Sequence, residues 1–404
     1  MKKLFSLLLA CCVGLILVPS LLVGCHKSDD PKPVVGTMAR NTVIIYMAAE
    51  NTLAEIVELD SAEIAAGVAK LPDSTRVVVF IDDTYSSRIL VGTSAHSLRL
   101  AKTYGRNICS TDSADMELVL ADIFRDYPSR HYGMVLWSHA SGWIPERQQA
   151  PRRRTFGIDN NRRNANSDLG TKMAVQTLAN VLAHHPHTDY LFFDACFMQC
   201  IEVAYQLRHV TDYLVGSPAE LPVDGAPYSL MLPLLAERKL LDAVRVYYDY
   251  YVTGEGSSGY LGIELSAIRT AGLEALVTAT RPLLLQLLAG RTELYCRGVQ
   301  HYYPYTSSDL YPEFYDIVSL FYNLLPSDVF GQWRQQFSQA VPLSLISKYW
   351  SSAFSRSMQI VYDPDHCGGV SVFVPSEDHV DVGWDDAYHN LDWYRANGLS
   401  ATGW

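Results

Sequence analysis

Short apolar runs alternate with helical patterns from about residue 41 onward. The runs are nearly continuous, which is typical of strands buried on both faces of a sheet. They predict strands at Thr42–Met47, Arg76–Ile81, Met134–Trp137, Tyr190–Phe193 and Asp212–Gly216. Helical spacing separates them over Thr52–Ala69, Asp115–Phe124 and Thr171–Ala183. This alternation favours an α/β fold in which helices cover both faces of a mostly parallel central sheet.

The pattern of apolar and polar residues changes after about residue 230. Helical spacing covers Tyr228–Tyr251 and Gly272–Leu288, and apolar runs predict strands at Tyr260–Leu265, Met358–Val361 and Gly369–Pro375. We therefore expect a core at residues 41–230. Residues 231–404 are expected to form a C-terminal extension that adds strands to the sheet and a helical subdomain.

Two reactive side chains follow neighbouring predicted strands. His139 comes after Met134–Trp137, and Cys196 comes after Tyr190–Phe193. In open α/β sheets the working groups lie just beyond the carboxyl ends of the strands. We therefore expect the imidazole and the thiol to meet, although they are far apart in the chain. A buried structural cysteine beside a core histidine is the alternative.

The residues after Cys196 have the spacing of one helical face, which is formed by Phe197, Ile201, Ala204, Tyr205 and Arg208. The positive end of a helix starting at Cys196 would favour its thiolate, which is the nucleophilic form. Backbone N–H groups there can receive an oxyanion. His139 can act as base toward the thiol and as acid toward a leaving amine.

A basic segment without apolar periodicity runs from Arg147 to Asp168, between the two strand ends. We predict that it is a long exposed loop. Loops of this length inside a compact domain are usually functional or mobile. Its arginines are Arg147, Arg152, Arg153, Arg154, Arg162 and Arg163.

The N-terminus has the pattern of a targeting segment. Lys2 and Lys3 precede an apolar run, Leu4–Leu22, and the run ends at Leu22-Val23-Gly24-Cys25. This pattern predicts a lipoprotein signal peptide at residues 1–24 and a lipid on Cys25. A flexible linker is expected at residues 25–40. The alternatives are a transmembrane anchor or an ordinary secretory signal. The predicted product is an exported, membrane-anchored bacterial lipoprotein.

Composition excludes several classes of function. The 404-residue chain has a net charge of −11, which argues against nucleic-acid binding. The pattern shows no zinc-type Cys/His spacing and no nucleotide-binding glycine motif, so we predict no cofactor and no metal site. After the predicted signal and Cys25, five cysteines remain, and an odd number leaves at least one thiol unpaired.

Two blocks of sequence carry a resemblance to a known family. The block Leu136–Trp143 around His139, and the block Phe193–Met198 followed by Ile201–Tyr205, are similar to the His and Cys blocks of the clostripain family of cysteine peptidases. The opening run Ile45–Asn51 resembles the first strand of that family. The resemblance covers roughly residues 41–230, and more loosely the rest.

The resemblance implies a caspase-like fold, a Cys/His dyad and cleavage after Arg or Lys. It places Asp194 and Asp224 in substrate binding, with Glu220 as a competitor. Each acid has an alternative role as a loop carboxylate or helix cap. It also implies that the backbone N–H groups at Ala140 and Cys196 receive the oxyanion. The family usually has Gly where this chain has Ala140, and Ala resists a positive φ. Some members require calcium.

Family members often mature by cutting themselves in the loop after the catalytic His. Arg152, Arg153 and Arg154 are the expected autocleavage sites, in a loop that continues to Arg163. The alternative is a solvated basic loop. The expected partners are protein or peptide substrates with Arg or Lys at the cleavage site, and a membrane through the lipid on Cys25. Two rival functions remain, an inactive binding lipoprotein of the same fold and a thiol hydrolase with non-basic specificity.

Overall fold

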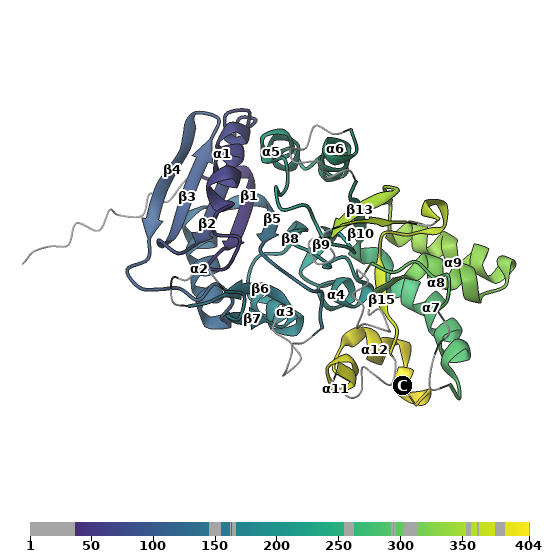
Figure 1. The fold of residues 1–404 in the computed structure, drawn as a ribbon. Coiled ribbons are helices and arrows are strands. Elements are labelled where there is room, and N and C mark those ends of the chain that lie inside the picture. Colours follow the sequence, from purple (N-terminus) through teal and green to yellow (C-terminus); the bar gives the residue numbers. More distant parts are fainter. Residues whose placement is uncertain are drawn as a thin grey trace, which may run out of the picture. The chain divides into compact units, whose positions relative to one another are not determined.

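The computed structural model describes residues 37–144, 155–161, 163, 167–253, 262–291, 294, 296–302, 314–352, 357–361, 363–375 and 384–403. They belong to one compact unit, Val35–Trp404. Figure 1 shows a central sheet with helices on both of its faces. In the described part of the chain this sheet has nine strands, in the order β12-β10-β9-β8-β5-β1-β2-β3-β4.

The middle of the sheet is parallel. Strand β1 pairs in parallel with β2 and β5, β5 pairs with β8, and β8 pairs with β9. The outer pairs β2–β3, β3–β4, β9–β10 and β10–β12 are antiparallel. The strands are β1 (Ala39–Ala48), β2 (Thr75–Asp82), β3 (Ser87–Thr93), β4 (His96–Thr103), β5 (Ser129–Trp137), β8 (Thr188–Asp194), β9 (Thr211–Gly216), β10 (Glu264–Arg269) and β12 (Leu343–Ile346).

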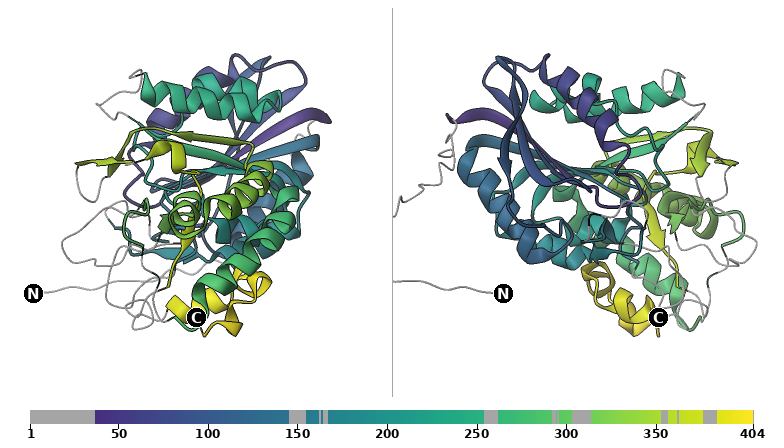
Figure 2. Two further views of the ribbon diagram at one scale, coloured as in Figure 1. Left: turned by 90° about the vertical axis from the view of Figure 1, so that its right-hand side faces the viewer. Right: turned by 60° about the vertical axis from the view of Figure 1, so that its left-hand side comes forward.

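Three two-stranded sheets lie outside the central one in the described residues. They pair β6 (Phe156–Asp159) with β7 (Thr171–Met173), β11 (Phe314–Asp316) with β15 (Ser371–Phe373), and β13 (Tyr349–Ser352) with β14 (Ser357–Ile360). Figure 2 gives two further views of this arrangement.

Helices bury both faces of the sheet, as its continuous apolar strands require. Val43 and Ile45 of β1 face one core with α1, α5 and α6, whereas Ile44 and Tyr46 face the other core with α2, α3, α4 and α7. The helices are α1 (Val57–Val68), α2 (Ser113–Asp126), α3 (Val175–Ala183), α4 (Ile201–Gln206), α5 (Tyr228–Ala236), α6 (Leu240–Val252), α7 (Leu273–Leu288), α8 (Ile317–Leu324), α9 (Ser327–Ala340), α11 (Trp384–His389) and α12 (Asp392–Asn397).

The structure corrects several predicted elements. The segment predicted as a long exposed loop contains β6, all four residues of which are buried. The predicted helix at Thr171–Ala183 begins as strand β7. The predicted helix at Tyr228–Tyr251 is two helices, separated at Arg238, whose φ of 63° is incompatible with a continuous helix. Strands β3 and β4 were missed because their partly exposed side chains lack a continuous apolar run.

Candidate active site

His139 and Cys196 follow the carboxyl ends of adjacent parallel strands. Trp137 of β5 pairs in register with Asp194 of β8. Each of the two reactive residues comes two positions after its strand's last paired residue. They therefore leave the sheet at the same edge and at equivalent positions, as the apolar pattern predicted.

A threonine hydroxyl and a carboxylate adjoin the imidazole of His139. The Oγ1 atom of Thr52 lies 2.9 Å from Nε2 of His139 and donates to Oδ1 of Asp168 over 2.9 Å. The same Asp168 oxygen lies 3.6 Å from Nε2. These contacts orient the ring. No pattern in the sequence indicated either contact. Thr52 follows the first strand and Asp168 lies in the basic segment, and only folding brings them next to His139.

The thiol of Cys196 is half-buried and receives a backbone donor. The N–H of Leu221 points to its sulfur, with an N–Sγ distance of 3.3 Å. A hydrogen bond of this kind favours the charged form of the acceptor. Phe197 has a φ of 61°, a conformation that is rare for a bulky residue and that recurs at functional sites.

The predicted helix at Cys196 is wrong. Helix α4 has only six residues and begins at Ile201, with Cys200 at its N-cap. The left-handed Phe197 interrupts any helix before that point. The helix dipole therefore does not act directly at the sulfur, since its effect falls off within the first turn. The N–H of Leu221 is the local donor instead.

The segment after β9 runs alongside the segment after Cys196. The N–H of Phe197 donates to the carbonyl of Ala219, and the N–H of Gln199 donates to the carbonyl of Ser217, each over 3.0 Å. Together with the bond from Leu221 to the sulfur, these contacts hold residues 217–221 against Cys196. Asp224 follows in the same stretch and is half-buried. Glu220 accepts from Ser352 Oγ of β13 over 3.2 Å.

The other described cysteines are poorer nucleophiles. None of them is in a disulfide. Burial raises the pKa of the thiols of Cys109, Cys200 and Cys367, so each stays protonated at neutral pH. Cys296 is partly buried and follows α7 in the chain rather than a parallel strand of the central sheet. Cys196 alone among the described cysteines combines partial exposure with a place at the carboxyl end of the parallel sheet.

Ala140 fits its position without backbone strain. It forms an antiparallel bridge with Phe156, and the bridging bonds run from Ser141 N–H to the Thr155 carbonyl and from Gly157 N–H to the His139 carbonyl. The N–H of Ala140 takes no part in this bridge. Ala140 is not left-handed, whereas Gly142 is, with a φ of 70°. The alanine found where the family usually has glycine therefore meets no conformational penalty.

Asp194 is buried and anchored by hydroxyl groups. Its Oδ2 accepts from Tyr228 Oη over 2.7 Å and from the N–H of Ala226 over 3.3 Å, and its Oδ1 accepts from Tyr247 Oη over 3.2 Å. Burial raises the pKa of Asp194, and the bond from Tyr228 counteracts this rise. The alternative that Asp194 caps the helix after Cys196 is wrong, because α4 has no side-chain cap.

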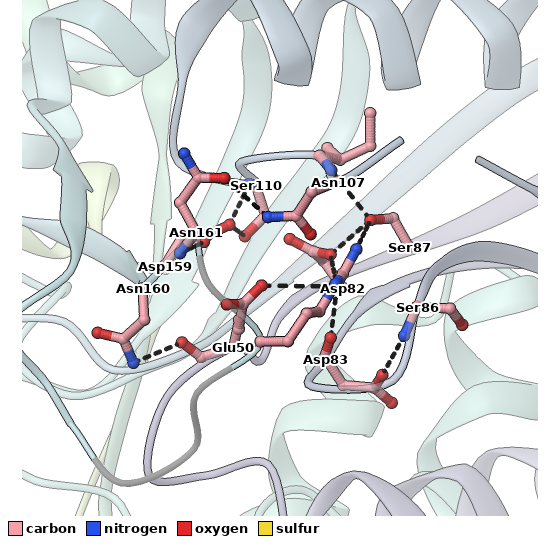
Figure 3. A network of polar contacts seen from close by, with 12 residues as sticks. Glu50, Asp82, Asp83, Ser86, Ser87, Asn107, Ser110, Asp159, Asn160 and Asn161 are labelled. Atoms are coloured by element: carbon pink, nitrogen blue, oxygen red, sulfur yellow. Dashed lines mark hydrogen bonds and ion pairs between the residues drawn. The ribbon is translucent and has the colours of Figure 1, made fainter. Parts of the chain in front are cut away.

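A cluster of acidic side chains, separate from Asp194, binds Arg163 near the C-terminal end of the basic segment 147–168 (Figure 3). Oxygens of Glu50, Asp82 and Asp159 lie within 4.8 Å of one another, and all three residues are buried. Burial, followed by the neighbouring Asp159, raises the pKa of Asp82 to about 8. The Nη1 atom of Arg163 lies 2.8 Å from Asp82 Oδ1 and 3.5 Å from Glu50 Oε2, and Nη2 donates to Ser87 over 2.8 Å.

Carboxylates arranged in this way can hold a hard cation. Arg163 already supplies a positive charge to them, which gives the cluster a structural role as an anchor. The calcium requirement implied by the family resemblance stays a prediction. The expected autocleavage sites, Arg152, Arg153 and Arg154, lie outside the described residues.

Comparison with known proteins decides the family. The sequence model of the clostripain family matches residues 45–398. The chain belongs to the clostripain family. It is a cysteine-type endopeptidase with a caspase-like α/β/α fold, as the two sequence blocks predicted. The search of curated proteins found no match.

Solved structures agree with this family assignment. A secreted C11 cysteine protease from Bacteroides thetaiotaomicron, in complex with an irreversible peptide inhibitor, is 27% identical with a TM-score of 0.76, covering 90% of this chain and 100% of that one. A B. fragilis cysteine protease is 29% identical with a TM-score of 0.52, covering 58% and 96%. An inactive zymogen C11 protease from Parabacteroides distasonis shares the fold at 23% identity, with a TM-score of 0.74 over 89% and 99%.

Proposed function

We propose that this clostripain-family protein cleaves peptide bonds after Arg or Lys, with Cys196 as nucleophile and His139 as general acid and base. The observation that carries the proposal is the exit of both residues from one sheet edge, beside the segment that leads to Asp224. Thr52 is proposed to orient the imidazole through its hydroxyl.

The proposed reaction has two halves. The thiolate of Cys196 attacks the scissile carbonyl carbon, and the backbone N–H groups of Ala140 and Cys196 receive the oxyanion. The C–N bond breaks as His139 gives a proton to the leaving amine, which leaves an acyl-thioester on Cys196. His139 then removes a proton from water. The resulting hydroxide attacks the thioester, the C–S bond breaks, and the carboxylic acid leaves. This restores the Cys196 thiolate and leaves the proton on His139.

A peptide series tests the proposed specificity. Fluorogenic peptides that differ only in Arg, Lys or Ala at the scissile position should be cleaved when that residue is basic, because a carboxylate pairs with a cationic side chain. We expect the Ala peptide to be cleaved at least about 100-fold more slowly. Equal rates for all three would favour a thiol hydrolase with non-basic specificity. Hydrolysis of none of them would favour the inactive binding lipoprotein.

We also propose that the enzyme processes itself within Arg152–Arg154. The side chain of Arg163 is engaged with Asp82 and Ser87, so it is not free to enter a substrate site. This engagement favours cleavage upstream of Arg163. A cut there would leave the downstream strand anchored by Arg163, with Asp168 still beside Thr52.

We propose that the protein is exported and anchored to a membrane through a lipid on Cys25. A structural relative is secreted, which is compatible with export. Among the described residues, no helix has both the length and the apolar character needed to cross a membrane. Residues 1–36, including the predicted signal, lie outside the described part.

The anchor can be tested by substitution. In the full-length chain, Cys25→Ala should prevent acylation, so metabolic labelling with a radioactive fatty acid should give no labelled protein. Cys11→Ala, which lies within the predicted signal, serves as the control and should be labelled as strongly as wild type. Labelling of Cys25→Ala equal to that of wild type would contradict the lipid anchor.

A further inference from the structure

Asp60, in the first turn of α1, is a buried carboxylate with an incomplete set of partners. The residue is only 1% exposed. Its Oδ2 accepts a hydrogen bond from Trp137 Nε1 over 2.7 Å. Among the described residues no second group donates to the Asp60 carboxylate, so Oδ1 has no donor from the protein. A carboxyl oxygen that has no donor from the protein can accept one from a group that enters the site.

The segment proposed to bind substrate passes directly over this carboxylate. Gly225 has a φ of 69°, and a Cβ on it would lie 3.2 Å from Asp60 Oδ2 and 3.3 Å from Oδ1. The next residue, Ala226, donates its N–H to Asp194. Successive residues of one turn thus contact Asp60 and Asp194, and Asp224 immediately precedes them.

These neighbouring acids have no internal cation beside them. Neither Asp60 nor Asp194 forms an ion pair with any described Lys, Arg or His residue. Burial raises the pKa of Asp60 to about 8, with a further rise from Asp194 and smaller ones from Glu63 and Asp224. Burial also raises the pKa of Asp194. Buried carboxylates are normally paired with cations, so this group has the electrostatics of a site that a cation from outside completes.

Aromatic side chains surround the same carboxylates. Tyr228 and Tyr247 donate to Asp194, and the hydroxyl of Tyr251 donates to the carbonyl of Gly225 over 2.8 Å. All three tyrosines are fully buried. The aliphatic stem of a long basic side chain packs well against such walls while its charged end meets the carboxylates.

We propose that Asp60 is a third specificity-determining residue, whose Oδ1 receives the cationic end of the substrate's basic side chain together with Asp194. This inference rests on the proposed function and deepens it. A guanidinium carries five N–H donors in a planar fork and can bridge two carboxylates, whereas an ammonium acts as a point charge. The arrangement therefore selects Arg over Lys at the cleavage position.

The test is the ratio of kcat/KM for the Arg peptide to that for the Lys peptide. Asp60→Asn keeps an oxygen to accept from Trp137 but cannot ionise when a cationic side chain binds, so we expect the Arg-to-Lys ratio to fall about tenfold or more. Glu58→Gln is the matched control, because it removes an exposed carboxylate from the same turn of α1, and its ratio should equal that of wild type. Alkylation of Cys196 by iodoacetamide, which is uncharged, should proceed at the wild-type rate in both variants.

Each outcome has a separate meaning. A folded Asp60→Asn enzyme with the wild-type Arg-to-Lys ratio would overturn the role of Asp60 and leave the proposed function intact. Wild-type protein that cleaves neither basic peptide would instead refute the proposed function. If Asp60→Asn does not fold, inhibition of the wild type by butylguanidine and butylamine decides the matter. Stronger inhibition by the guanidine supports the inference, and equal inhibition overturns it.

Discussion

Replacing Cys196 with Ala is expected to lower kcat/KM for an Arg peptide by on the order of 10⁴-fold or more, because removing the nucleophile of a covalent mechanism eliminates the acyl-enzyme route. The measurement is single-turnover hydrolysis of the fluorogenic peptide at high enzyme concentration. The same variant should also remain a single chain by mass spectrometry, since we attribute cleavage within Arg152–Arg154 to the enzyme itself.

Cys200→Ala is the control for this substitution. The Cys200 thiol is 0% exposed, and burial raises its pKa, so its loss should affect packing and leave hydrolysis near the wild-type level. Cys196→Ala protein that hydrolyses the peptide at the wild-type rate would refute the nucleophile assignment. A cut chain that lacks activity would assign the processing to another protease.

The strand ends were predictable because burial on both faces leaves a simple pattern. Val43, Ile44, Ile45 and Tyr46 are all buried, so a continuous apolar run marked the central strand. The polar residues that follow such runs mark the working edge of the sheet, and the placement of His139 and Cys196 followed from that rule.

The conformation after Cys196 was not predictable from periodicity. The helical spacing from Phe197 to Arg208 arose because residues on both sides of a sharp turn pack into one core. Only Ile201–Gln206 is helical, and the left-handed Phe197 is held by its N–H bond to Ala219, about twenty residues downstream. A contact of that range leaves no local signal in the sequence.

The burial of Asp60 was likewise not predictable from the sequence. In the sequence it is one of several acids in a predicted helix, where most carboxylates face solvent. Its burial depends on Trp137 from β5 and on the turn at Gly225, which come from distant parts of the chain. The buried strand β6 escaped notice for a related reason, since four residues flanked by polar sequence resemble a loop.

Replacing Asp194 with Asn is expected to lower kcat/KM for both the Arg and the Lys peptide by about 100-fold, because truncating one member of a buried charge pair costs several kcal/mol. The change keeps one oxygen that can accept from Tyr228 and removes the negative charge. Hydrolysis of the Ala peptide should change much less, so the ratio of kcat/KM for the basic peptides to that for the Ala peptide should fall sharply. Steady-state kinetics on the three peptides measure this directly.

Tyr247→Phe separates the charge of Asp194 from its positioning. That variant removes only the 3.2 Å hydrogen bond to Oδ1, so we expect a loss of less than about tenfold that is equal for all peptides. Asp194→Asn protein that keeps the wild-type preference for basic over Ala peptides would contradict the assignment. The proposed roles of the two buried acids thus predict different results. Loss of Asp194 should weaken cleavage after any cationic residue, because both Arg and Lys need one carboxylate. Loss of Asp60 should weaken cleavage after Arg selectively, because only a guanidinium can bridge two carboxylates.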